Sequence, residues 1–374
     1  MMPSSVMSSV SLCIAGGGTG GHVMPALTLA DAAREAWPGL NVDFIGAERG
    51  LEARMLPEHG EDVMLLAMHS IQGAGLLQKL RVLGWELPRA IMAIRKHWKH
   101  NRPALVIGVG GYASVAGILA AIISRIPVLL YEQNAIPGLV NRRLVRFSKA
   151  IMLGFAGAAH WLPAEKCRIT GNIVRKSIEQ VGWQAHTPPH LLVLGGSQGA
   201  SFLNKTVPHA CRILKEQGHE FQVTHIAGSY ENAVGQVRAD YEQAGIKARV
   251  MEFCDTMPDF YASGDLMIAR SGAMTVGEAQ ACGMPGIFIP LPHAADHHQF
   301  YNAKASSDNG GAIIIEQDSC TAANLADHLS ELLFAPSRLS LMSQAAKSAA
   351  PFSAKKLQLQ AVQSCLPQLA EAVA

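Results

Sequence analysis

The sequence has 374 residues and a formal net charge of +2, with 49% hydrophobic and 16% charged residues. This composition excludes a largely disordered chain, and the length suits two domains better than one. So small a net charge gives no general attraction to nucleic acid, which is therefore not an expected partner.

Cysteine usage and the N-terminus bear on the compartment. Seven cysteines lie far apart, and none has C-x-x-C spacing. Neither a zinc site nor a disulfide framework is therefore predicted, and a reducing compartment fits best. The first residues, MMPSSVMSSVSLCIAG, lack the basic start and long apolar core of a secretory signal.

Short apolar strands alternate with helical stretches along the whole chain. The expected strands are VSLCIA, NVDFIG, VMLLA, ALVIGV and PVLLY in the first half, and HLLVLGG, FQVTHIAG, ARVMEF, DLMIAR and GIFIPL in the second. This rhythm predicts the α/β class, with parallel sheets covered by helices on both faces. A strand and a glycine turn open each half, which predicts two Rossmann-like domains. The join is expected within residues 171–190, where prolines collect.

The first glycine loop, IAGGGTGGHVMPALTLA at residues 14–30, satisfies G-x-G-x-x-G at Gly16, Gly18 and Gly21. A lone match is weak, and the dinucleotide fingerprint also needs an acidic residue about 20 positions on. Asp43 lies inside the next expected strand and Glu48 lies beyond it. A dehydrogenase therefore remains an alternative.

His22 follows this loop directly, and Pro25 fits the first turn of a helix. His22 would then lie at the helix mouth, at the carboxyl edge of a parallel sheet where ligands bind. A packing histidine is the alternative, and we favour a functional one.

Residues 104–124, ALVIGVGGYASVAGILAAIIS, carry no charge and are long enough to span a bilayer. A glycine pair interrupts the run, so we favour a buried strand, a glycine turn and a buried helix.

Two further glycine loops resemble the first one. The loop GVGGYAS places Tyr112 at a strand end, and GGSQGAS places Ser197 at another helix start. Three such loops favour phosphate binding by backbone donors and helix N-termini.

The segment from Asp265 to Pro292 predicts a strand, then a helix that begins near residues 273–275 and ends at Gly283. Its N-terminus suits a diphosphate. Glu278 would accept hydrogen bonds from both ribose hydroxyls, or would be a surface charge that complements the helix dipole. In DHHQFYNA, Gln299 and Asn302 suit sugar hydroxyls. The adjacent His297 and His298 cannot face the same way, so metal binding is not expected.

Seven segments in order resemble the MurG family: GGGTGGHVMPAL, GVGGYAS, YEQNAIPGLVNR, GNIVR, GGSQGA, RSGAMTVGEA and DHHQFYNA. That family consists of peripheral membrane glycosyltransferases that add GlcNAc to undecaprenyl-pyrophosphoryl-MurNAc-pentapeptide (lipid I), giving lipid II for peptidoglycan. The resemblance implies a GT-B fold, inverting transfer from UDP-GlcNAc, and neither a cofactor nor a metal. It also implies location at the cytoplasmic face of the bacterial inner membrane.

Residues are carried over position by position. The implied UDP-GlcNAc contacts are Thr19, Gly20, Gly21, Asn134, Arg175, Ser197, Cys254 (through its backbone), Ala273, Met274, Thr275, Val276, Gly277, Glu278 and Gln299. Gly16, Gly17, Gly18 and Tyr112 are expected to bind the acceptor. His22 is the expected general base because imidazole titrates near working pH, and Glu132 is the alternative. Two departures are Tyr131, where the family often has His, and Ile173, where it usually has Pro.

The resemblance assigns residues 1–172 to an acceptor and membrane-facing domain, with residues 351–374 packing back on it, and residues 173–350 to UDP-GlcNAc binding. Residues 75–100 mix leucines and a tryptophan with lysines and arginines, as do helices that bind anionic lipid surfaces. Alternatives are a GT-B transferase with another lipid acceptor, a UDP-GlcNAc epimerase, and a non-catalytic nucleotide-sugar-binding subunit. The sequence leaves the oligomeric state open.

Overall fold

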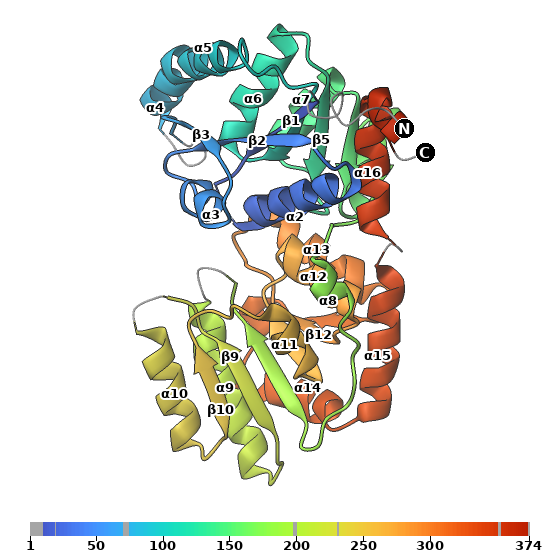
Figure 1. The fold of residues 1–374 in the computed structure, drawn as a ribbon. Helices are drawn as coiled ribbons and strands as arrows, with labels where there is room; N and C mark the ends of the chain where they lie inside the picture. The colour runs from blue at the N-terminus through green and yellow to red at the C-terminus, as the bar shows by residue number, and fades with distance from the viewer. Residues whose placement is uncertain are drawn as a thin grey trace. The chain divides into compact units, whose positions relative to one another are not determined.

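Two parallel β-sheets organise the chain, one in each of two units (Figure 1). The computed structural model describes residues 10–372 except 19, 70–74, 197–199, 230–231 and 351–352. One unit is Met1–Ile173 with Phe352–Ala374, and the other is Val174–Pro351. The sequence placed this boundary between residues 172 and 173.

The first unit contains a seven-stranded sheet in the order β3-β2-β1-β4-β5-β6-β7, with every pairing parallel. Its strands are β1 (Ser11–Gly16), β2 (Asn41–Ala47), β3 (Val63–Leu66), β4 (Leu105–Gly110), β5 (Val128–Glu132), β6 (Ala150–Leu153) and β7 (Cys167–Ile169). Its α-helices are α2 (Gly20–Ala36), α3 (Glu52–Glu58), α4 (Leu76–Arg81), α5 (Leu87–His97), α6 (Tyr112–Ile123), α7 (Leu139–Leu144) and α16 (Ala354–Cys365). A π-helical turn, η1 (Val82–Glu86), joins α4 to α5.

Side chains along β1 point alternately to the two faces of the sheet, so the core of the first unit has two layers. Leu12 and Ile14 pack with α2 and α16 on one face of the sheet. Cys13 and Ala15 pack with α5 and α6 on the other face. Figure 1 shows α16 crossing close to one end of α2, and the two helices are in contact. The amide of Gln358 on α16 donates to the carbonyl of Gly171 at 2.8 Å.

The second unit contains a six-stranded parallel sheet in the order β10-β9-β8-β11-β12-β13. Its strands are β8 (His190–Leu194), β9 (Gln222–Ile226), β10 (Ala248–Met251), β11 (Leu266–Ala269), β12 (Gly286–Phe288) and β13 (Ala312–Ile314). Its α-helices are α8 (Lys176–Glu179), α9 (Ser201–Glu216), α10 (Ala233–Gln243), α11 (Met257–Ala262), α12 (Ala273–Cys282), α13 (His298–Ser307), α14 (Ala322–Leu333) and α15 (Pro336–Ala349).

The predicted α/β class and all ten predicted strands are confirmed. The sequence missed β6, β7 and β13, which have only three or four residues each. The uncharged run 104–124 forms β4 and α6, and no helix in the described part of the chain is long and apolar enough to cross a membrane. Pro25 lies in the second turn of α2, because the helix begins at Gly20; the prediction of a first-turn proline was wrong.

A buried histidine makes the second unit sensitive to acid. His225 on β9 is fully buried, with Nδ1 3.0 Å from the hydroxyl of Tyr241 and Nε2 3.1 Å from Oδ1 of Asn204. Burial lowers the pKa of His225 from 6.5 to about 3. Below pH 6.5 the imidazole of His225 is therefore protonated in the unfolded chain but stays neutral in the folded unit. The free energy of unfolding falls as the pH falls.

We expect this histidine alone to remove up to about 1.4 kcal/mol of unfolding free energy per pH unit below its ordinary pKa. Urea unfolding across that pH range measures the slope. The variant His225→Gln keeps the size and polarity of the side chain but cannot titrate, so its slope should be shallower. Equal slopes in the parent and the variant would contradict this assignment.

Candidate active site

Two glycine loops of the first unit pack main chain against main chain. The peptide N–H of Gly17, after β1, donates to the carbonyl of Gly110, at the end of β4, at 3.2 Å. A Cβ added to Gly16 would lie 2.5 Å from that carbonyl, and one added to Gly111 would overlap the carbonyl oxygen of Gly17. The bare backbone of the first loop therefore accommodates the second loop.

The N–H groups of these loops differ in what they can bind. Those of Gly17 and Gly18 are already used, the second by the carboxylate of Glu52 at 2.6 Å. The first turn of α2, from Gly20, has N–H groups without acceptors inside the helix. An anion at this edge would therefore meet the start of α2 rather than the N–H groups of residues 17 and 18. Thr19 lies outside the described residues.

His22 lies in the first turn of α2 and is partly exposed. Its Nε2 lies 2.8 Å from the place that a Cβ on Gly110 would occupy. Gly110 has φ of +100°, so both its conformation and the space above it require glycine. The glycine at the end of β4 thereby lets the imidazole rest against the backbone.

Tyr112 begins α6 on the other side of the same loops. Its ring carbon Cε1 lies 4.0 Å from the place that a Cβ on Gly18 would occupy. Burial, and then the charge of Glu52, raise the pKa of the phenol. The structure thus brings Gly16, Gly17, Gly18, His22 and Tyr112 together at one edge of the first sheet.

Glu132, at the end of β5, is buried and shapes the loop that follows it. One carboxylate oxygen accepts from the N–H of Asn134 at 3.0 Å. The other accepts from the N–H of Gly138 and from the amide of Asn141, both at 2.8 Å. Both oxygens therefore hold the 132–141 loop, which includes the predicted site residue Asn134.

Helix α12 of the second unit begins and ends as the sequence predicts. Gly272 precedes its first residue, Ala273, and Gly283 ends it in the left-handed conformation with φ of +71°. The buried amide of Asn302 on α13 donates to the carbonyl of Ser271 at 3.1 Å. Residues 273–278 therefore form the first turns of α12. The residues just before this helix are held by the hydrogen bond from Asn302 on α13.

Glu278 lies in the second turn of α12. Its Oε2 accepts from the hydroxyl of Tyr261 at 2.9 Å, and its Oε1 lies 3.8 Å from the guanidinium of Arg175. Burial raises the pKa of this carboxyl, although the Tyr261 hydrogen bond and the Arg175 charge oppose the shift. Arg175 and Glu278, two predicted site residues, are thus neighbours.

Three other residues were predicted to contact UDP-GlcNAc: Gln299, Cys254 and Ser197. Oε1 of Gln299 accepts from the N–H of Leu291 at 3.0 Å. Cys254 follows β10 and is partly exposed. Ser197 lies outside the described residues. In the described chain, no group of three or more His, Cys, Asp and Glu side chains could hold a metal ion.

The two departures from the family pattern meet in the structure. The buried hydroxyl of Tyr131 donates to Oδ1 of Asn172 at 3.1 Å and accepts the N–H of Ile173 at 3.2 Å. Proline at position 173 would have no N–H to donate. The tyrosine and the isoleucine therefore form one contact rather than two unrelated changes.

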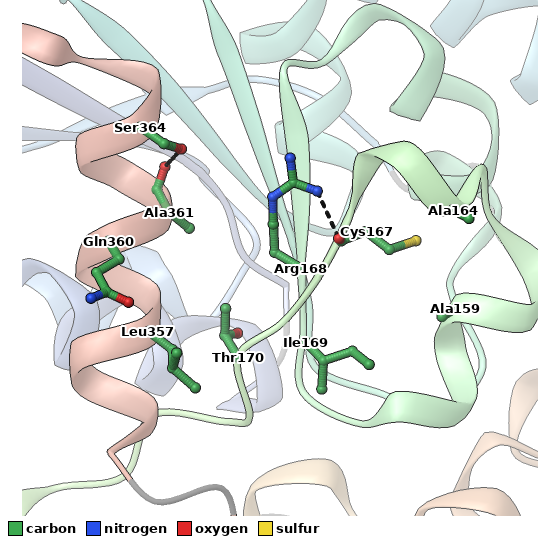
Figure 2. A pocket seen from close by; sticks show the side chains of 10 residues that line it. All are labelled: Ala159, Ala164, Cys167, Arg168, Ile169, Thr170, Leu357, Gln360, Ala361 and Ser364. Carbon is green, nitrogen blue, oxygen red and sulfur yellow. Dashed lines mark hydrogen bonds between the residues drawn. The ribbon is translucent and has the colours of Figure 1, made fainter.

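A cavity of about 540 Å³ lies between the edge strand β7 and α16 (Figure 2). The guanidinium of Arg168 turns back onto the carbonyls of Cys167 and Glu165, at 2.9 and 3.0 Å. None of the predicted site residues lines this cavity. The cavity is therefore separate from the residues gathered around His22.

Comparison with known proteins covers both units. The glycosyltransferase family 28 N-terminal domain matches residues 12–153, and the C-terminal domain of that family matches residues 190–358. A protein of Anaeromyxobacter sp. (strain K) named UDP-N-acetylglucosamine--N-acetylmuramyl-(pentapeptide) pyrophosphoryl-undecaprenol N-acetylglucosamine transferase is 39% identical over 350 residues, 92% of this chain and 91% of its own. The chain belongs to the MurG family. A namesake from Geobacter sulfurreducens is 38% identical over 351 residues, covering 92% of this chain and 96% of its own.

A solved structure agrees with this membership. The crystal structure of Acinetobacter baumannii MurG matches with a TM-score of 0.77 and 29% identity, over 95% of this chain and 99% of that one. The predicted GT-B class, with one parallel α/β sheet in each of two units, is confirmed.

Proposed function

We propose that this chain transfers GlcNAc from UDP-GlcNAc to the C4 hydroxyl of MurNAc in lipid I, giving lipid II for peptidoglycan synthesis. The observation that carries the proposal is a match to relatives named for this transfer along 92% of the chain. The reaction inverts the anomeric centre, from an α-linked UDP sugar to a β-1,4 product.

The second unit supplies the donor site in this proposal. The opening N–H groups of α12 and the positive end of its dipole face the diphosphate, which needs no cation there. Nε of Arg175 is buried and has no hydrogen-bond partner within the described residues, and a phosphate oxygen would provide one. Oε1 of Glu278 accepts from the ribose, while Oε2 stays bound to Tyr261.

The first unit supplies the acceptor site and the base. The C4 hydroxyl oxygen of MurNAc attacks C1 of GlcNAc, and the bond from C1 to UDP breaks. The proton of that hydroxyl passes to the imidazole of His22. The start of α2 meets the lipid pyrophosphate, with Tyr112 beside the loop. Glu132 holds its own loop with both oxygens, so we assign it to positioning Asn134 rather than to the proton transfer.

Transfer of radiolabelled GlcNAc from UDP-GlcNAc to a lipid I analogue, with EDTA present, tests this function. We expect a labelled lipid product that forms only when the acceptor is added. Transfer to a different lipid would favour another acceptor. Tight UDP-GlcNAc binding without transfer would favour a non-catalytic subunit, and thermal stabilisation by NAD instead of UDP would favour a dehydrogenase.

We also propose peripheral attachment to the cytoplasmic face of the bacterial inner membrane. The segment α4–η1–α5 exposes a row of large apolar side chains, and no residue of α4 is buried. These side chains are Leu76, Leu77, Leu80, Leu83, Trp85 and Met92. Lys79, Arg81 and Arg89 lie among them, with Arg89 over the ring of Trp85 at 5.3 Å. An apolar face bordered by cations suits an anionic lipid surface.

The double variant Leu77→Ser, Leu80→Ser should bind phosphatidylglycerol vesicles about 100-fold more weakly, because two leucines lose their burial in the bilayer. Sedimentation with vesicles measures this affinity. Leu341→Ser, an equally exposed leucine on α15 of the second unit, is the control and should bind like the parent. Binding that is equal in all three proteins, or insensitive to anionic lipid, would contradict attachment through this segment.

A further inference from the structure

Glu52 is a buried acid that no step above uses. It is the first residue of α3 and is 1% exposed. Its Oε1 accepts the N–H of Ala47, at the end of β2, at 2.8 Å. Its Oε2 accepts the N–H of Gly18 at 2.6 Å. One carboxylate thus ties the carboxyl ends of two neighbouring strands together.

The surrounding chain leaves space for this carboxyl group. A Cβ added to Gly17, Gly46 or Gly50 would overlap the side chain of Glu52 in each case. These three glycines come from three different segments: the loop after β1, the strand β2, and the turn before α3. Buried carboxylates are costly unless they are hydrogen-bonded, so a site with room and two N–H donors for Glu52 is a specific arrangement.

The bond from Gly18 determines the shape of the loop. Gly18 has φ of +99°, a conformation that glycine adopts readily and other residues rarely adopt. Its N–H is directed inward to Glu52, and its α-carbon faces the ring of Tyr112. Four residues later comes His22, on the helix that this loop starts. The position of the loop therefore sets where α2 begins and where the imidazole lies.

We infer that Glu52 is a positioning residue for the acceptor side of the reaction, acting through the N–H of Gly18 on the loop before α2. The carboxylate does not touch the acceptor. It holds the loop through the N–H of Gly18, so that the start of α2 and the side chains of His22 and Tyr112 lie at the same edge of the sheet. This inference rests on the proposed function for its kinetic consequence, but not for its structural one.

The variant Glu52→Gln tests the inference because its amide keeps the size of the side chain but has only one acceptor oxygen for two N–H donors. We expect kcat/KM for a lipid I analogue to fall about 10- to 100-fold, the factor that corresponds to one charge-assisted hydrogen bond. The Kd for UDP should stay at the parent value. Hydrogen exchange of the peptide covering residues 16–22 should accelerate, because the loop loses its anchor.

Glu58→Gln is the matched control: it changes an exposed glutamate of the same helix, which pairs only loosely with Arg54 at 3.7 Å. It should leave all three measurements unchanged. If Glu52→Gln exchanges in residues 16–22 like the parent, the inference is overturned, whatever the activity. Parent-like kcat/KM in Glu52→Gln would overturn it too.

Failure of the proposed function would give a different result. The parent protein would then transfer no GlcNAc to the lipid, while Glu52→Gln would still accelerate hydrogen exchange of residues 16–22. Should Glu52→Gln not fold, Glu52→Asp serves instead. Its shorter side chain keeps the charge but cannot span both N–H groups, so the same loss in kcat/KM and the same faster exchange are expected.

Discussion

Replacing His22 with alanine is expected to lower kcat about 100- to 10,000-fold, the usual contribution of a positioned general base. The KM for UDP-GlcNAc should change little, since the proposed nucleotide contacts around α12 belong to the other unit. The physical reason is local. The imidazole rests against Gly110 at the opening of α2, beside the loop where the acceptor is proposed to bind.

Steady-state kinetics across pH measure this effect, because the loss of the imidazole should also remove its limb from the pH profile of kcat/KM. His59→Ala is a suitable control: His59 is exposed in the same unit, and its Nδ1 lies 2.7 Å from the carbonyl of Met55. Near-parent kcat in His22→Ala would remove His22 from the chemistry.

Glu132→Gln separates the two candidates for the base. The Glu132 carboxylate accepts hydrogen bonds from three residues that follow it, Asn134, Gly138 and Asn141. We therefore expect the variant to lower the stability of the first unit and to keep much of its kcat. A loss of kcat as large as that of His22→Ala, with an unchanged Tm, would transfer the role of base to Glu132.

The sequence predicted those parts of the fold that depend on local signals. Gly272, Gly283 and Pro285 bound α12, and the structure agrees with each. Runs of apolar residues predicted ten strands, including the three-residue β12, but not β6, β7 or β13. The edge strand β7 is mostly exposed and contains no apolar run to detect. Pro25 was placed one turn early, since a glycine pair rather than the proline begins α2.

Contacts between distant segments could not be predicted. No motif in the sequence marks Glu52, and only the fold brings its carboxylate 2.6 Å from the N–H of Gly18. Tyr131 and Ile173 appeared as two independent departures, and a hydrogen bond of 3.2 Å joins them. The glycine loops suggested a cradle for phosphate, whereas the structure uses the N–H groups of Gly17 and Gly18 within the protein.

The variant Glu278→Gln is expected to weaken UDP binding and to stabilise the second unit at the same time. A neutral amide accepts hydrogen bonds from ribose hydroxyls less strongly than a carboxylate, so Kd should rise about 10- to 100-fold. Stability should change in the opposite direction. Burial raises the pKa of Glu278 above 4.5, so the folded unit resists ionisation of this group.

The pH dependence of stability gives this prediction its sign. At pH well below 4.5 the carboxyl is neutral in both folded and unfolded chains, and Gln and Glu should be equivalent. As the pH rises through the folded pKa, the parent must ionise a buried group and loses stability that the amide keeps. The Tm of Glu278→Gln should therefore exceed that of the parent at neutrality, and the difference should vanish in acid.

Calorimetry and UDP titration measure the two effects on the same samples. Glu331→Gln is the control, because Glu331 is exposed on α14 and pairs with Arg338 at 3.4 Å; it should change neither quantity. An unchanged Kd would remove Glu278 from the ribose, and a lower Tm would mean that the contacts with Tyr261 and Arg175 outweigh the cost of burial. A carboxylate kept at a cost in stability is typical of a residue retained for ligand binding, here proposed to accept hydrogen bonds from the ribose hydroxyls.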